Sequence, residues 1–266
     1  MNETLEAMAQ AIFRDWFVDF GPVRRKLAGA AGPVEIMGGL THDPASATAM
    51  AKLFPGEFGG GDLPTGWRLM ALSAVADHCK GAVNPQALPD VLFEHYSLPA
   101  YDSGREAARD LGASIKSNKV PVPAGAVLLS KLNPEIPRVW APSDATGLPQ
   151  VASTEFLVFK PKPGASRGLL YFLFRDPIVR QIMEGMVTGT SKSHQRISPP
   201  ALLKTDLVVG DDAAFAGFNE LAEPILRRVL ALRAENRTLA ETRDYLLPRL
   251  MSGEVRVGDV ASEIAA

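Results

Sequence analysis

The sequence has little cysteine and no long apolar run. Its single cysteine, Cys79, excludes a disulfide framework and is typical of a protein in a reducing compartment. No apolar run reaches the roughly 20 residues that a membrane-spanning helix needs. The first residues include Glu3 and Glu6 and lack the basic start and apolar core of a secretory signal. We therefore expect a cytoplasmic protein without membrane contact.

A large net charge is also missing. The 266 residues carry a formal net charge of −2, so the chain as a whole is not a polycation. Apolar residues make up 46% and charged residues 22%, which is the balance of a folded globular protein rather than a disordered one. The length allows one large domain, or one domain with appended segments.

No catalytic or metal-binding pattern is complete. The glycine-rich residues 58–61 follow no predicted strand, so they are typical of a linker rather than a cofactor loop. Residues 133–135 (Asn, Pro, Glu) lack the second proline and the aromatic residue of a DNA methyltransferase catalytic loop. Asp90 and Glu94 are followed by Tyr96 where a metal nuclease needs lysine. The four histidines show no ligand spacing. The sequence predicts a protein that is not an enzyme and holds no metal.

Two related helix-forming segments occupy the ends of the chain. Residues 2–18 carry apolar residues at helical spacing, and residues 213–247 predict the longest helix, with heptad-like spacing. About 35 helical residues span about 50 Å, too long a rod to be covered by one small domain. We expect it to need a partner helix, the alternative being a core helix of an ordinary globule. The predicted pairing positions are Leu5, Met8, Ile12 and Trp16 in the first segment and Ile225, Val229, Leu232, Asn236, Leu239 and Leu246 in the second. Leu247 and Pro248 should kink or end the long helix.

The middle of the chain predicts short strands and turns. Candidate strands are residues 126–130, 151–159 and 204–209. One short helix should start at Asp43 and Pro44, and another, over 166–181, should be interrupted near Asp176. The predicted fold class is α+β, with one mixed α/β domain that has a small β-sheet and is flanked by helices. The expected division is an N-terminal helix (1–22), a linker with a short helix (23–62), a central domain (63–212), a long coiled-coil-forming helix (213–253) and a tail (254–266).

Positive charge is concentrated in residues 160–204. Eight basic residues (Lys160, Lys162, Arg167, Arg175, Arg180, Lys192, Arg196 and Lys204) against two acids (Asp176 and Glu184) give +6 locally, in a chain whose total is −2. Small hydroxyl residues and glycine at 188–193 let a backbone approach phosphate. Gln195 and Arg196 have the geometry that reads adenine and guanine edges. A solvated loop with ordinary surface lysines is the alternative. The predicted DNA-binding positions are Lys116, Lys119, Lys131, Lys160, Lys162, Arg167, Thr188, Gly189, Thr190, Ser191, Lys192, Ser193, His194, Gln195 and Arg196.

The organisation of the chain resembles the DNA-specificity subunit of type I restriction–modification systems. Residues 2–9 and 16–23 look like the end of that family's central conserved helix, and residues 63–67 resemble the entry to a target-recognition domain. Residues 190–199 resemble the loop and strand that close such a domain. Residues 236–239 and 247–255 look like the distal conserved helix and its terminus. The usual family member has two recognition domains, so this sequence is similar to a half-length form with one.

The resemblance implies a non-catalytic subunit that reads one part of a bipartite double-stranded DNA site and docks methyltransferase subunits. S-adenosylmethionine and ATP are then expected on partner subunits and no cofactor on this chain. A restriction subunit and an antiparallel homodimer are further expected partners. Two alternatives remain: an assembly or interaction protein that does not read DNA, and a fragment of a longer two-domain specificity subunit.

Overall fold

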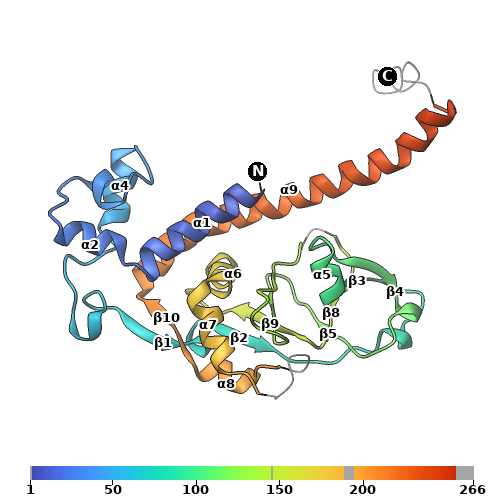
Figure 1. The fold of residues 1–266 in the computed structure, drawn as a ribbon, viewed down its shortest axis with the longest axis horizontal. Helices are drawn as coiled ribbons and strands as arrows, with labels where there is room; N and C mark the ends of the chain where they lie inside the picture. The colour runs from blue at the N-terminus through green and yellow to red at the C-terminus, as the bar shows by residue number, and fades with distance from the viewer. Residues whose placement is uncertain (1, 145, 189–194, 256–266) are drawn as a thin grey trace.

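A long C-terminal helix and an α/β module below it dominate the computed structural model (Figure 1), which describes residues 2–144, 146–188 and 195–255. The α-helices are α1 (Asn2–Phe17), α2 (Gly21–Leu27), α3 (Pro33–Ile36), α4 (Pro44–Ala51), α5 (Leu98–Asp102), α6 (Arg167–Arg175), α7 (Pro177–Gly185), α8 (Pro199–Lys204) and α9 (Asp212–Ser252). The strands are β1 (Arg68–Ala71), β2 (Ala76–Cys79), β3 (Leu92–Tyr96), β4 (Ala108–Leu111), β5 (Val120–Pro121), β6 (Val127–Ser130), β7 (Val139–Trp140), β8 (Gln150–Ala152), β9 (Phe156–Pro161) and β10 (Asp206–Gly210). Single 3₁₀ turns occupy Gly60–Asp62, Leu72–Ala74, Pro85–Ala87 and Gly112–Ser114.

The α/β module is built on two four-stranded sheets. One has the strand order β2-β9-β6-β7 and is antiparallel throughout. The other has the order β4-β3-β8-β5, in which β3 and β8 run parallel. The chain enters the module through β1 and leaves it through β10, and these two strands pair with each other as a separate antiparallel ribbon. The predicted α+β class is confirmed, with helices at both ends of a mixed α/β module.

The sheet β2-β9-β6-β7 is buried on both faces, which follows from the alternation of side chains along a strand. In β9, Leu157 and Phe159 belong to the core under α6, whereas Phe156 and Val158 belong to a second core around Trp140. All six aliphatic and aromatic side chains of α6 from Leu169 to Phe174 are buried. This double burial makes the sheet the rigid centre of the module.

Helix α1 packs antiparallel on the first half of α9 (Figure 1). Phe13 and Trp16, near the end of α1, contact Phe218, near the start of α9. Glu6, near the start of α1, forms an ion pair with Arg233, four turns further along α9. The two end segments that the sequence relates to each other therefore pair within one chain.

The face that α1 buries agrees with the predicted face only in part. Its buried residues are Glu6, Ala9, Phe13, Trp16 and Phe17, while the predicted pairing residue Met8 is 53% exposed. Of the other predicted residues, Trp16 is buried and Ile12 packs against the core, and the aromatic rings of Phe13 and Phe17, which the prediction left out, enlarge the buried face.

Two other expectations are wrong, one for a strand of the module and one for the linker that precedes it. The predicted strand 151–159 is divided into β8 and β9 by a turn, in which the amide of Phe156 donates to the carbonyl of Ser153 at 2.9 Å. The predicted linker contains three helices, α2, α3 and α4, rather than one. Helix α4 itself was predicted, and its cap is Asp43, whose carboxylate accepts the amide of Ser46 at 2.8 Å.

The break near Asp176 is confirmed, because Asp176 ends α6 and caps α7. Of the two outcomes expected at Pro248, a kink or an end, the second does not occur: helix α9 continues to Ser252, and its C-cap is Gly253, whose φ of 76° is left-handed. Within the part of the chain that the structure describes, no helix combines the length and apolar character needed to cross a membrane.

Candidate nucleic-acid interface

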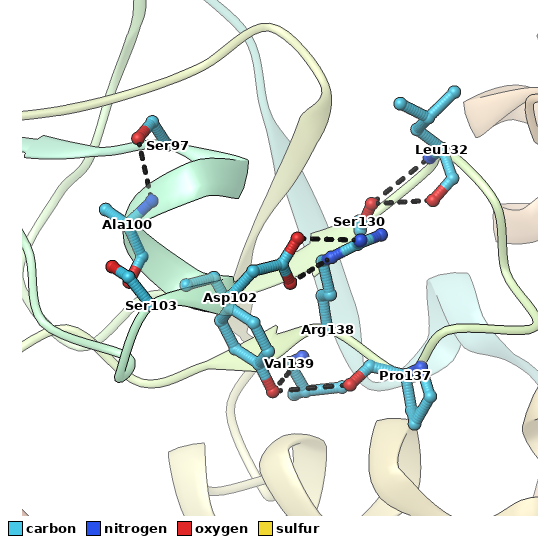
Figure 2. A network of polar contacts seen from close by, with 10 residues as sticks. Ser97, Ala100, Asp102, Ser103, Ser130, Leu132, Pro137, Arg138 and Val139 are labelled. Carbon is cyan, nitrogen blue, oxygen red and sulfur yellow. Dashed lines mark hydrogen bonds and ion pairs between the residues drawn. The ribbon is translucent and has the colours of Figure 1, made fainter. Parts of the chain in front are cut away.

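One end of the sheet β2-β9-β6-β7 presents Lys131, directly after β6. Ser130 fixes the turn, because its hydroxyl donates to the carbonyl of Leu132 at 2.9 Å and accepts the amide of Leu132 at 3.2 Å (Figure 2). The amide of Lys131 donates to the carbonyl of Glu155, and its carbonyl accepts the amide of Ile197, at 2.9 and 3.0 Å. The Lys131 backbone is therefore held on both sides.

Two hydrogen bonds between Arg138 and Asp102 hold the start of β7, the strand next to β6. Arg138 of the same hairpin forms a two-bond pair with Asp102 at the end of α5, with distances of 2.7 and 2.9 Å (Figure 2). Bonding to Arg138 lowers the pKa of the Asp102 carboxyl below its ordinary value. The hairpin that carries Lys131 is thus attached to α5, the helix that follows β3 of the other sheet.

The predicted positions Thr188, Gln195 and Arg196 lie beside Lys131. Arg196 makes isolated β-bridges to Thr188 and to Leu132, and the carbonyl of Gln195 accepts the amide of Asn133 at 3.0 Å. The structure therefore brings these residues together although 57 positions separate Lys131 from Thr188 in the sequence. The predicted residues Gly189, Thr190, Ser191, Lys192, Ser193 and His194 lie outside the described residues.

Arg196 is engaged within the protein. Its Nε and Nη2 atoms donate to the two carboxylate oxygens of Glu155 at 3.1 and 3.0 Å. This bidentate pair uses the same fork that would recognise guanine. Arg196 can therefore read a base only if Glu155 releases it.

Lys80 and His78 join this group and were not predicted. Burial lowers the pKa of the His78 imidazole below its ordinary value, and the positive charges of Lys80 and Lys131 lower it further. Cys79 pairs with Val158 and Ser130 with Phe156, so Lys80 and Lys131 follow strands that end on the same side of the sheet. We define the basic surface as Lys80, Lys131, Thr188, Gln195 and Arg196. Lys80 directly follows β2, and it lies near Lys131 because β2 pairs with β9. The sequence alone does not indicate this strand pairing.

The other predicted cations lie elsewhere. Lys160 is exposed near the opposite end of β9, about 16 Å along the strand from Glu155. The Lys162 ammonium donates to the carbonyl of Ser73 at 2.6 Å and lies 3.4 Å from Asp77. Lys116 is exposed after the turn Gly112–Ser114, in the other sheet's region.

Two predicted DNA-binding residues are buried. The Lys119 ammonium is 3.0 Å from the carbonyl and 2.6 Å from the hydroxyl of Ser117. The Arg167 guanidinium donates to the carbonyls of Ala126 and Pro142 and pairs with Asp144. These contacts argue against a role in DNA binding for either residue. A count of charges along the sequence cannot distinguish a buried cation from an exposed one.

Acidic residues border the basic surface. Glu135 and Glu184 line a cavity of about 280 Å³ together with Gln195. Carboxylates near a DNA-contacting residue repel phosphate and accept hydrogen bonds from cytosine amino groups. Among the described residues, no cluster of histidine, cysteine and carboxylate side chains suits a metal ion.

The module and the helices meet in a buried ionic cluster. Glu6 of α1 is 4% exposed and pairs with Arg233 of α9, with Arg175 of α6 at 3.3 Å and with Arg105, which follows α5, at 3.7 Å. The hydroxyl of Tyr171 also donates to Glu6 at 3.2 Å. One carboxylate thus ties both helices to two parts of the module.

The second half of α9 has no such cover. In Figure 1 it extends past the end of α1, and from residue 237 to residue 252 its side chains are exposed or half-buried. Of the predicted pairing positions, Val229 is fully buried, whereas Leu239 is 61% exposed. Tyr245, Leu247, Leu250 and Met251 add further exposed apolar area. Exposed apolar residues of this kind are typical of protein interaction surfaces.

The fold is that of an α/β module borne by an antiparallel helix pair. No family model matches the chain. It is 24% identical over 298 aligned residues to the type I restriction enzyme HindI specificity subunit of Haemophilus influenzae, covering 96% of this chain and 62% of that protein. It is 20% identical over 269 residues to the type I restriction enzyme MjaIX specificity subunit of Methanocaldococcus jannaschii, covering 97% of this chain and 55% of that protein.

Solved structures of similar proteins include the HsdS subunit from Thermoanaerobacter tengcongensis, with 19% identity and a TM-score of 0.42 over 95% of this chain and 58% of that one. The S subunit of a type I system from M. genitalium has 15% identity and a TM-score of 0.44 over 75% of this chain and 49% of that one. The chain is homologous to the specificity subunits of type I restriction enzymes and spans less than two thirds of the length of the curated relatives it matches.

Proposed function

We propose that the chain is a non-catalytic DNA-recognition subunit of a type I restriction–modification complex. It reads one part of a bipartite site with its α/β module and docks methyltransferase subunits with its helices. The proposal is carried by the placement of the basic surface on a module that the Glu6 cluster fixes to α9. The similarity to two specificity subunits along almost the whole chain supports it.

In this proposal the basic surface contacts DNA. Lys80 and Lys131 neutralise phosphates, because neither has an ion pair among the described residues. Gln195 contacts base edges, and Arg196 contacts them as well once its ion pair with Glu155 is broken. Residues 189–194 extend the contact, as the sequence predicts. Phosphate contacts set the register, and the base contacts supply the sequence preference.

The uncovered half of α9 is the proposed docking surface for a methyltransferase subunit. S-adenosylmethionine and ATP are bound by partner subunits, and this chain supplies recognition and spacing. A restriction subunit joins the same assembly. A second copy of the chain, related by a two-fold axis, would compete for the same helix and place two modules on one palindromic, split site.

The decisive experiment maps DNA methylation in cells that express the cognate methyltransferase with or without this chain. We expect modified adenine or cytosine at one bipartite motif only when the chain is present. The double variant Lys80→Ala/Lys131→Ala should reduce that modification, whereas Lys52→Ala, an exposed lysine after α4, should not. A methylation pattern that does not depend on the chain would exclude the proposal.

Docking is tested separately with Leu239→Lys/Leu247→Lys. Both side chains are more than half exposed, so the folded chain should keep its thermal stability. Co-purification with the methyltransferase should be lost. Sedimentation of the unmodified chain alone distinguishes the competing arrangement: a dimer that the double variant dissolves would assign this surface to a second copy.

A further inference from the structure

A cavity of about 170 Å³ lies between α9 and the sheet β4-β3-β8-β5, away from the basic surface. Its lining includes Glu94 and Tyr96 of β3 and Trp140 of β7. Arginines approach it from both sides, Arg109 from β4 and Arg237 from α9. The cavity thus combines a carboxylate, two aromatic rings and several cations, none of which the proposed DNA contact uses.

Glu94 is a buried hydrogen-bond acceptor whose three side-chain donors among the described residues all reach the same carboxylate oxygen. The residue is 2% exposed, and its Oε2 atom accepts from the Tyr96 hydroxyl at 3.0 Å, the Thr146 hydroxyl at 3.1 Å and the Gln150 amide at 2.8 Å. No donor to Oε1 is recorded among the described residues. Oε1 is not among the buried side-chain atoms that lack a partner, and Arg109 is the cross-strand neighbour of Glu94, so a donor in the cavity would add to the interactions that Glu94 already has. Since Glu94 lines the cavity, a ligand can supply it.

The aromatic residues suit a planar ring. Tyr96 and Trp140 are 2% and 4% exposed, and their ring centroids lie 4.8 Å apart at an interplanar angle of 82°. Burial and the neighbouring Glu94 raise the pKa of the Tyr96 hydroxyl, so it stays a donor to Glu94 at all physiological pH values. The pair is therefore a rigid apolar surface whose polar atom is already occupied.

The rim favours an anion. Four arginines (Arg105, Arg109, Arg233 and Arg237) line the cavity against three glutamates (Glu94, Glu106 and Glu241). Arg105 and Arg233 share Glu6, and Arg237 pairs with Glu241 at 3.0 Å. Arg109 is exposed and has no ion pair within the described ranges. Its guanidinium is thus free to bind a phosphate through two parallel hydrogen bonds.

We propose that this cavity binds a nucleotide whose base carries an exocyclic amino group, adenine or cytosine. The amino group donates to Glu94 Oε1, the base packs on Tyr96 and Trp140, and the phosphate pairs with Arg109. A carboxylate accepts from the amino group of cytosine or adenine, whereas the carbonyl oxygen of uracil or hypoxanthine would face it as a second acceptor. The ligand is either a free nucleotide or an unpaired nucleotide of a DNA strand, which share this chemistry.

The test is isothermal titration of the purified full chain with AMP, CMP, UMP and IMP. We expect AMP or CMP to bind at least about tenfold more tightly than its carbonyl counterpart, IMP or UMP respectively. Single-stranded oligonucleotides of dA, dC and dT form the second arm. Binding in either arm with this preference supports the site and identifies its source. Absence of saturable binding in both arms, or equal binding of all bases, overturns it.

Two variants separate the contacts. Glu94→Gln should abolish the preference for amino bases, and its melting temperature is measured alongside because the residue is buried. Arg109→Ala is exposed and leaves the core intact, so it should weaken AMP and CMP binding equally, by about tenfold or more for a lost charge-assisted pair. Arg68→Ala, an exposed arginine of β1, is the matched control. Unchanged binding by Arg109→Ala contradicts the phosphate contact. Duplex recognition by the basic surface is measured independently, so the two proposals fail separately.

Discussion

Glu6 of α1 and Arg233 of α9 form an ion pair in which the carboxylate is 4% exposed and the guanidinium 24%. The same carboxylate lies between Arg105 and Arg175, so one negative charge faces three positive charges. The pair joins residues that are 227 positions apart in the sequence. The pair joins the two helices, and Arg105 and Arg175 bring the α/β module to the same carboxylate.

Removing this carboxylate should destabilise the whole chain. Glu6→Ala leaves three arginines facing one another in a largely buried site, and breaking a buried pair in this way costs about 3–5 kcal/mol. Urea unfolding followed by circular dichroism measures the loss. The control is Glu241→Ala, which breaks the exposed pair with Arg237 on the same helix and should cost at most about 0.5 kcal/mol. Equal effects of the two variants would show that Glu6 is not a structural centre.

The sequence shows the local signals and misses the long-range ones. The break between α6 and α7 was predictable, because Asp176 is a cap followed by proline and both act within a few residues. The burial of Glu6 was not, since a carboxylate is placed in a core only when distant arginines meet it. The same reasoning explains Arg167 and Lys119, which contribute to the charge of the sequence but not to the surface.

The basic surface was half predictable for a related reason. Thr188, Gln195 and Arg196 belong to a polar, basic stretch of the sequence, and Lys131 is also among the predicted DNA-binding positions. Lys80 becomes their neighbour only because β2 pairs with β9 and β9 with β6. Glu155 reaches Arg196 by the same strand pairing, and no sequence spacing indicates that this arginine is already occupied.

Lys131→Ala should weaken DNA binding without changing its sequence preference. An ammonium that neutralises one phosphate releases about 0.9 of a counterion, so the slope of log K against log salt should fall by about that amount. Fluorescence anisotropy of target and scrambled duplexes between low and moderate salt measures both quantities. Lys116→Ala removes an exposed lysine in the region of the other sheet and should leave the slope unchanged. A loss confined to the target duplex would instead mean that Lys131 contacts a base.

His78 should make stability fall in mild acid. Burial lowers the pKa of the folded imidazole below the ordinary value of 6.5, and Lys80 and Lys131 lower it further. Above pH 6.5 the His78 ring is neutral in both the folded and the unfolded state, so the free energy of unfolding has its full value. As the pH falls below 6.5, the unfolded state takes up a proton before the folded state does, and the free energy of unfolding decreases. His78→Gln should flatten the decrease between pH 7 and pH 5 in urea unfolding. An unchanged slope would rule out this cause.

The close packing of α6 on α9 depends on Gly168. A Cβ atom at this position would lie 3.0 Å from the Cβ and 3.1 Å from the carbonyl carbon of Ala222, and the amide of Gly168 donates to Glu223 at 3.0 Å. Gly168→Ala should therefore force the two helices apart and cost about 1–3 kcal/mol. Gly185→Ala is the matched change, because it also lies in a helix, at the end of α7, but meets no atom within 4 Å. It should stabilise the chain by about 0.4–1 kcal/mol. Thermal unfolding of both variants measures the difference. If Gly168→Ala melts at as high a temperature as Gly185→Ala, α6 does not pack tightly on α9. In that case this contact does not hold the module, and with it the basic surface, in a fixed position relative to α9.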